Sequence, residues 1–246
     1  MSGSTRYDEI AEWYDAWVGA DDLAGDPFFP AVETLMGNVA HQRICDLACG
    51  QGRVARHLAR RGAHVIGVDV SDKLLEIARR HEGIEPRGID YRHIDARTLD
   101  GIPDDHFDGV MCFLALMDVP DLVPTIQSVA RTLRSGGWFI FAILHPCYNT
   151  PRSDEMPSPL GWMRVVGSYF TESHWRSEKR SGPPGKVGVH HRTLSTYFNT
   201  AVEAGFQLVQ VSEPQASGDR AAARPIWTEV PAVLIAKWQK VADKDG

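Results

Sequence analysis

The sequence is poor in cysteine, with four among 246 residues and no pair in the CxxC spacing. The four are Cys45, Cys49, Cys112 and Cys147, and three of them lie in or beside apolar runs. We therefore expect buried free thiols rather than a disulfide framework or a cysteine-based metal site. The first residues also lack the basic flank and apolar run of a secretion signal, so a cytoplasmic protein is predicted.

Long apolar runs and an excess of positive charge are missing as well. No uninterrupted apolar stretch approaches the roughly 20 residues of a membrane helix. The 26 lysines and arginines are outnumbered by 32 acidic residues, for a net charge of −6, which argues against a broad grip on nucleic acid or anionic lipid. The base-flipping motif Asn-Pro-Pro-Tyr is absent from residues 113–120, which read FLALMDVP. The expected partner is a small molecule, with neither nucleic acid nor membrane.

An alternation of apolar runs and helix-period segments is what the chain does contain, from about residue 42 to 145. Strands are predicted at 44–47, 64–69, 89–94, 107–114, 138–144, 206–211 and 232–238. Helices are predicted at 53–61, 72–80, 122–133 and 194–204. Strands that are apolar on both faces and separated by helices indicate an α/β fold, a doubly wound parallel sheet whose ligands bind at the carboxyl ends of its strands.

A glycine-rich turn follows the first predicted strand. Gly50, Gly52 and Ala55 satisfy the pattern G-x-G-x-x-[GA], and Asp69 ends the second strand. That combination alone is also compatible with a nicotinamide or flavin site, and hence with a dinucleotide oxidoreductase. The residues around the turn must decide between these ligands.

Two further aspartates at strand ends favour a different ligand. Asp46 ends the first strand directly before the turn, where a carboxylate is awkward beside a pyrophosphate but suits an ammonium group. Asp95 ends the third strand, at a position that allows it to accept a hydrogen bond from an adenine amino group. The fourth strand opens with Phe107-Asp108-Gly109-Val110, in the form common to methyltransferases.

With these motifs the chain resembles class I S-adenosylmethionine-dependent methyltransferases, in the small-molecule branch that includes the ubiquinone and menaquinone biosynthesis enzymes. The matching motifs, in family order across 42–145, are Asp46-Leu47-Ala48-Cys49-Gly50-Gln51-Gly52, Val65-Ile66-Gly67-Val68-Asp69-Val70-Ser71, His93-Ile94-Asp95-Ala96 and Leu133-Arg134-Ser135-Gly136-Gly137. One departure is Ala48, where many members carry glycine. The resemblance implies S-adenosyl-L-methionine as cofactor and a Rossmann-like seven-stranded sheet, mostly parallel with one antiparallel strand near the C-terminus.

The resemblance also implies a role for each matching position. Gly50 and Gly52 would let the backbone approach the methionine moiety, Asp46 would face its amino group, and Asp69 would take both ribose hydroxyls. Asp95 would hold the adenine edge. The remaining residues of the predicted cofactor site are Tyr7, Tyr14, Ala48, Val70, Ala96 and Phe113.

The chain divides into four predicted parts. Residues 1–36 form a helical lid, because 7–15 resembles the segment that these enzymes fold over the cofactor; an ordinary amphipathic surface helix is the alternative. The α/β core spans 37–145. A proline- and glycine-rich stretch, 146–190, which carries Trp162, Tyr169, Phe170 and Trp175, is expected to form a substrate cap. Residues 191–246 supply a helix and two strands that complete the sheet.

Three side chains are candidates for taking a proton from the acceptor. Asp118 follows the fourth strand, His145 follows the fifth, and His191 lies where the long insertion returns. Imidazole titrates near neutrality, so it can act as a base, although for any single one of these histidines a structural or exposed role is favoured. No metal is predicted, because the adjacent His190 and His191 do not share a face.

The expected reaction is transfer of a methyl group to O or N of a small-molecule metabolite by in-line displacement. Positioning is the main demand of such a reaction. C-methyl transfer and a non-methylating reaction on the same fold stay open as alternatives, and a dinucleotide oxidoreductase is less favoured. The chain is expected to be a monomer or a homodimer.

Overall fold

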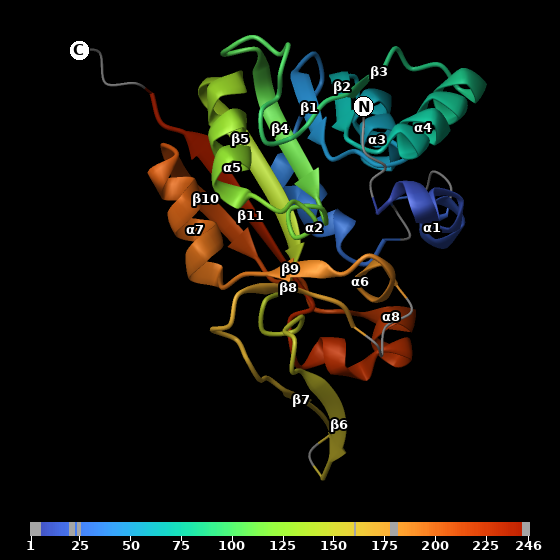
Figure 1. Cartoon of the computed structure of the whole chain (residues 1–246), viewed down its shortest axis with the longest axis vertical. Helices are drawn as coiled ribbons and strands as arrows, with labels where there is room; N and C mark the ends of the chain where they lie inside the picture. The colour runs from blue at the N-terminus through green and yellow to red at the C-terminus, as the bar shows by residue number, and fades with distance from the viewer. Residues whose placement is uncertain (1–5, 20–22, 24–25, 160, 178–181, 243–246) are drawn as a thin grey trace.

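The computed structural model describes residues 6–19, 23, 26–159, 161–177 and 182–242. Its centre is a seven-stranded sheet with the order β10-β11-β5-β4-β1-β2-β3 (Figure 1). The strands are β1 Arg43–Leu47, β2 His64–Asp69, β3 Asp90–His93, β4 Phe107–Phe113, β5 Leu133–Leu144, β10 Phe206–Ser212 and β11 Val233–Lys240. Only β11 is antiparallel to its neighbours in this sheet, so the predicted topology is confirmed.

Helices cover both faces of the sheet. They are α2 Phe29–Met36, α3 Arg53–Arg60, α4 Asp72–Ile84, α5 Leu122–Thr132 and α7 Leu194–Glu203. Helix α1 Ala11–Val18 and a short 3-10 turn, η1 Asp8–Ile10, pack against α4 instead. Because side chains alternate along a strand, neighbours enter different cores: Ile44 packs with α2, α3 and α4, whereas Cys45 packs with α5 and α7. Burying a leucine or isoleucine in such a core contributes about 1.5–3 kcal/mol. This explains why the strands are apolar on both faces.

The segment 146–190 contains regular structure that its sequence did not predict. One hairpin pairs β6 Asp154–Ser158 with β7 Gly161–Val165, and a second pairs β8 Ser173–Trp175 with β9 Val189–His191. A single turn of helix, α6 Pro183–Lys186, lies between the strands of the second hairpin. Strands of three to five residues are too short for an alternating pattern to stand out, and Pro157 within β6 conceals it further.

A second unpredicted segment connects β10 to β11. It contains α8 Gly218–Ala223 and the 3-10 helix η3 Pro225–Thr228. Figure 1 shows the carboxyl ends of β4 and β5 pointing toward β8, β9 and α6, with α8 below and α1 to one side. No helix in the described ranges combines the length and the apolarity that a membrane crossing requires.

Candidate active site

A cavity of about 1930 Å³ lies at the carboxyl edge of the parallel strands. Ligand pockets usually measure about 300–1,000 Å³, so this one has room for a cofactor and an acceptor together. Its wall has two parts. We call the lining residues between positions 6 and 120 the cofactor half, and those between 144 and 233 the cap half.

The glycine turn forms the floor of the cofactor half. Gly50 lines the cavity with φ of +54°, and a Cβ there would meet Tyr14 Cε1 only at 3.7 Å. Gly52 lies outside the lining, has φ of +81°, and would place a Cβ 2.7 Å from Tyr91 Cζ. Gly52 is therefore needed for the left-handed backbone and for packing against Tyr91, which differs from the predicted close approach to the methionine moiety.

Ala48, the departure from the family pattern, has φ of +55° and lines the cavity. The left-handed region costs a residue with a Cβ about 1–2 kcal/mol. The turn thus keeps the backbone conformation that glycine favours, although an alanine occupies it. This is strain stored beside the ligand site.

Asp46 is a buried carboxylate whose surroundings favour a cationic ligand. It is 2% exposed, it lines the cavity, and its Oδ2 has no hydrogen-bond partner in the described part of the chain. Burial raises the pKa of Asp46 to about 8. A buried unpaired carboxylate is costly, and an ammonium group on a ligand offsets that cost. The methionine amino group of S-adenosylmethionine fits this position.

Asp69, at the end of β2, is oriented by the backbone on both sides. Its Oδ2 accepts from the Gly50 amide at 2.8 Å, and its Oδ1 accepts from the Ser71 amide at 2.8 Å. Burial raises its pKa. Each carboxylate oxygen keeps a second acceptor position, and the residue lines the cavity, so the pair of oxygens suits two neighbouring hydroxyls.

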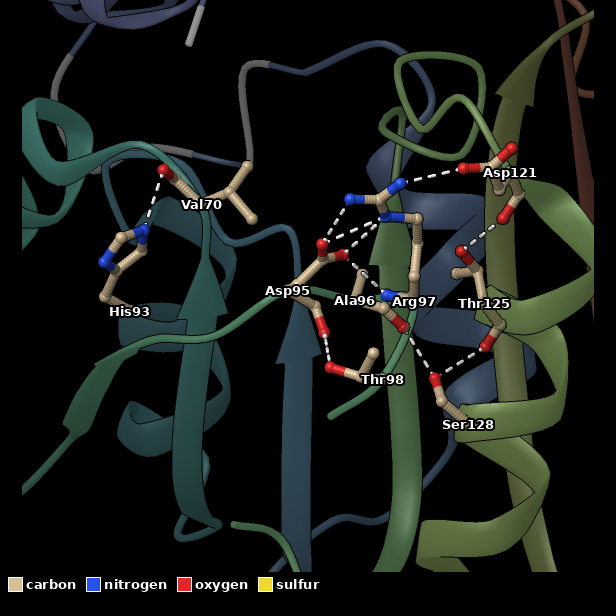
Figure 2. Close-up of polar contacts among 9 residues, drawn as sticks. All are labelled: Val70, His93, Asp95, Ala96, Arg97, Thr98, Asp121, Thr125 and Ser128. Atoms are coloured by element: carbon tan, nitrogen blue, oxygen red, sulfur yellow. Dashed lines mark hydrogen bonds and ion pairs between the residues drawn. The ribbon is translucent and has the colours of Figure 1, made fainter. Parts of the chain in front are cut away.

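The predicted adenine edge lies at the end of β3 (Figure 2). Val70, Asp95 and Ala96 all line the cavity there. Asp95 is bound by the guanidinium of Arg97, whose Nε and Nη2 lie 2.9 and 2.7 Å from Oδ2, and these hydrogen bonds lower the pKa of Asp95. The same guanidinium reaches Asp121 Oδ2 at 2.8 Å. A base at this edge would share Asp95 with Arg97, a contact that sequence motifs did not predict.

The predicted lid lies against the cofactor half. Asp8 accepts a hydrogen bond from Ser71 Oγ at 2.6 Å, next to the N-terminus of α4, where a negative charge is favoured. Tyr7 and Tyr14 meet edge to face at 5.4 Å, and both line the cavity. These contacts support the lid interpretation over that of a separate surface helix.

Asp118 is the one predicted proton acceptor that lines the cavity. Its Oδ2 accepts from the Tyr7 hydroxyl at 3.0 Å, while its Oδ1 is buried without a partner among the described residues. Burial raises the pKa of Asp118 to about 7. A carboxyl that titrates there exchanges protons readily near neutral pH.

The two candidate histidines are engaged elsewhere. His145 Nε2 lies 2.8 Å from Glu213 Oε1, and its Nδ1 accepts from the Cys147 amide at 3.1 Å. His191 Nε2 contacts the Tyr169 carbonyl at 2.8 Å. Both rings are buried outside the cavity lining. Their positions support a structural role and not the predicted role as base, because the hydrogen bonds that hold them point away from the site.

Arg192, next to His191, is a residue whose role sequence motifs did not reveal. Its guanidinium donates to the Leu116, Val119 and Pro120 carbonyls at 3.2, 2.7 and 2.7 Å. The side chain therefore holds the loop that carries Asp118. The local sequence offers no signal for this, since the carbonyls lie more than 70 residues away in the chain.

Aromatic side chains line the passage between the two halves. The rings of Phe28 and Trp227 lie 5.4 Å apart, and Trp227 Nε1 donates to Tyr148 Oη at 2.9 Å. All three line the cavity. This aromatic wall suits a planar, apolar portion of a ligand. In the described ranges, no group of three or more His, Cys, Asp or Glu side chains is arranged to hold a metal ion.

Comparison with known proteins shows which family this chain resembles. A model described as "Methyltransferase domain" matches residues 45–141. The ubiquinone biosynthesis O-methyltransferase of Nitrosomonas europaea is 36% identical over 114 residues, which are 46% of this chain and 48% of that enzyme. The match thus spans about half the length of this curated relative.

Two solved structures extend the comparison. The [4+2]-cyclase SpnF is 17% identical, with a TM-score of 0.65 over 96% of this chain and 94% of that one, and it shares the fold alone. The crystal structure of an S-adenosylmethionine-dependent methyltransferase from Mesorhizobium loti is 30% identical, with a TM-score of 0.77 over 89% of this chain and all of that one. This chain therefore belongs to the S-adenosylmethionine-dependent methyltransferases, and S-adenosylmethionine is its cofactor.

Proposed function

We propose that the enzyme methylates an oxygen or nitrogen atom of a small, partly aromatic metabolite held between the cofactor and the cap. The observation that carries this proposal is Asp118, which lines the cavity and whose Oδ1 is buried without a hydrogen-bond partner among the described residues. The name of the Nitrosomonas relative, an O-methyltransferase, is consistent with it.

The residues of the chain would align the acceptor and exclude water. When bound, S-adenosylmethionine supplies a methyl group on a sulfonium that is already activated for displacement. Alignment of the reactants can lower a barrier by roughly 7–11 kcal/mol in favourable cases. In this proposal the lid, residues 1–36, and the cap, 146–190, close the site from two sides, and Phe113 borders the reacting centre.

Asp118 would take the proton that a hydroxyl or ammonium acceptor loses. Tyr7 occupies Oδ2, which leaves Oδ1 for the acceptor. Because burial raises the pKa of Asp118 to about 7, the carboxylate is available at neutral pH and still basic enough to accept a proton. Asp118 is thus proposed as the catalytic base.

A test is to incubate the enzyme with methyl-labelled cofactor and a panel of phenols, aromatic amines and carbon acids. We expect labelled product from phenols or amines, with the methylated atom assigned by NMR. For the best acceptor, kcat should rise about tenfold per pH unit below pH 7 and level off above it, because the base is the deprotonated form. Product from carbon acids alone would contradict the proposal.

The matched variants are Asp118→Asn and Asp100→Asn, the latter an exposed aspartate outside the cavity. Loss of the base should lower kcat about 100- to 10,000-fold and flatten its pH profile, with cofactor affinity retained. The control should behave as the unsubstituted enzyme. An unchanged kcat and pH profile in Asp118→Asn would refute the role of this residue.

A further inference from the structure

The two halves of the cavity differ in their charged side chains. The lining of the cofactor half contains five aspartates and three arginines, namely Asp26, Asp46, Asp69, Asp95, Asp118, Arg6, Arg53 and Arg97. The cap half is basic, with Arg152, Arg164, Arg176, Arg220 and Arg224 against Asp154 and Glu155. Since the whole chain has a net charge of −6, this concentration of arginine is local to the cap half.

Arg164 is the buried member of the cap-half arginines. Its side chain is only 5% exposed, and its Cζ lies 4.2 Å from the centre of the Tyr148 ring. One Nη contacts Glu155 at 3.3 Å and the other donates to Ser153 Oγ at 2.6 Å, yet Nε has no partner in the part of the chain that the structure describes. A buried cationic N–H without an acceptor is costly, so an anionic oxygen in the cavity would stabilise it.

Arg152 and Arg220 add two guanidinium groups to the same half of the cavity. Neither side chain forms a hydrogen bond or ion pair with any described residue. They come from different segments, the cap and α8, and Arg224 joins these segments through an ion pair of 3.8 Å with Glu155. The planar fork of arginine suits carboxylate and phosphate oxygens in particular.

From this arrangement we propose that the acceptor carries an anionic group, a carboxylate or a phosphate ester, bound by Arg164, Arg152 and Arg220. The inference rests on the proposed function, because it places the methyl-accepting atom near Asp118 and the anion in the cap half of the cavity. The cationic cofactor and the anionic acceptor are then drawn to opposite halves of one cavity.

Calorimetry on the protein loaded with S-adenosylhomocysteine tests the inference with three phenols that differ in the substituent opposite the hydroxyl. These are 4-hydroxybenzoate, 4-hydroxyphenyl phosphate and the neutral 4-hydroxybenzamide. We expect at least one anion to bind about tenfold or more tightly than the amide, and its affinity to fall as salt rises. Whichever anion shows the larger increase in affinity over the amide tells whether the acceptor carries a carboxylate or a phosphate.

Variants locate the binding site of the anion. Arg152 and Arg220 are both at exposed positions. In the double variant Arg152→Gln and Arg220→Gln, the affinity for the preferred anion should fall to the affinity for the amide. Arg92→Gln, which removes an arginine outside the cavity, should leave the preference intact. Equal binding of all three probes, no saturable binding of either anion, or an equal loss in the control would overturn the inference.

The outcomes separate this inference from the proposed function. Anion binding that depends on Arg152 and Arg220, without methylated product from any phenol or amine, supports the inference and refutes the proposed reaction. Methylation of neutral and anionic acceptors with the same KM supports the reaction and refutes the inference.

Discussion

The cofactor half and the cap half of the cavity are built by different rules. Of the acids in the cofactor half, Asp46, Asp69 and Asp95 lie at or just after the ends of β1, β2 and β3, and the parallel sheet places these strand ends at one edge. The arginines of the cap half come from the cap segment 146–190 and from the connection between β10 and β11, which the register of the seven-stranded sheet does not fix. The first half can therefore be inferred from spacing, whereas the second depends on contacts between distant segments.

The largest expected effect belongs to the cofactor half. Asp69→Ala removes both acceptors proposed for the ribose hydroxyls, and hydrogen bonds to a charged group contribute about 1.5–3 kcal/mol each. We expect the Kd for S-adenosylmethionine to rise at least about 100-fold, measured by calorimetry.

Binding of the anionic probe to the cap half should change little in the same variant. Asp90→Ala, at an exposed position on β3, is the matched control. If Asp69→Ala weakened both ligands equally, with the thermal transition unchanged, the two halves would not be independent sites.

A smaller effect is expected where the halves meet, at Arg192. Arg192→Met leaves three carbonyls of the Asp118 loop without their charged donor, so unfolding free energy should fall by about 2–4 kcal/mol in urea titrations. Displacement of the loop should lower kcat about 10- to 100-fold while cofactor Kd changes little. Arg192→Lys should recover part of both losses, and a variant with unaltered kcat would show that the loop is held by other contacts.

The smallest effect is a proton linkage at Asp46. Because burial raises its pKa to about 8, Asp46 is mostly protonated below that pH, and a ligand ammonium must bind the carboxylate form. Binding then releases a proton, so Kd for the cofactor should tighten about tenfold from pH 6 to pH 7 and level off above pH 8. Asp46→Asn should bind weakly with no such slope; a wild-type Kd that is constant over this range would exclude the linkage.

How far prediction reached depended on the range of the contacts involved. The seven-stranded sheet was predicted from local patterns of apolar residues and from the family resemblance. The sheet and the family were both confirmed. The geometry of Asp46 and Asp69 supports their predicted roles, because each role depends only on a strand end. His145 illustrates the opposite case: its position after β5 is correct, but its partner Glu213 lies 68 residues away. Arg192 was missed for the same reason, because its carbonyl partners lie more than 70 residues away.

The one antiparallel strand has a consequence for how acceptor choice can change. Since β10 runs parallel to β5 and β11 runs back between them, the chain must reverse at the carboxyl edge, beside the cavity. A few residues suffice for such a reversal. Here residues 213–232 occupy it, and they include Arg220, Arg224 and Trp227. This segment is a natural graft point: exchanging it between relatives should alter which acceptor is methylated while the residues that hold the methyl donor stay untouched.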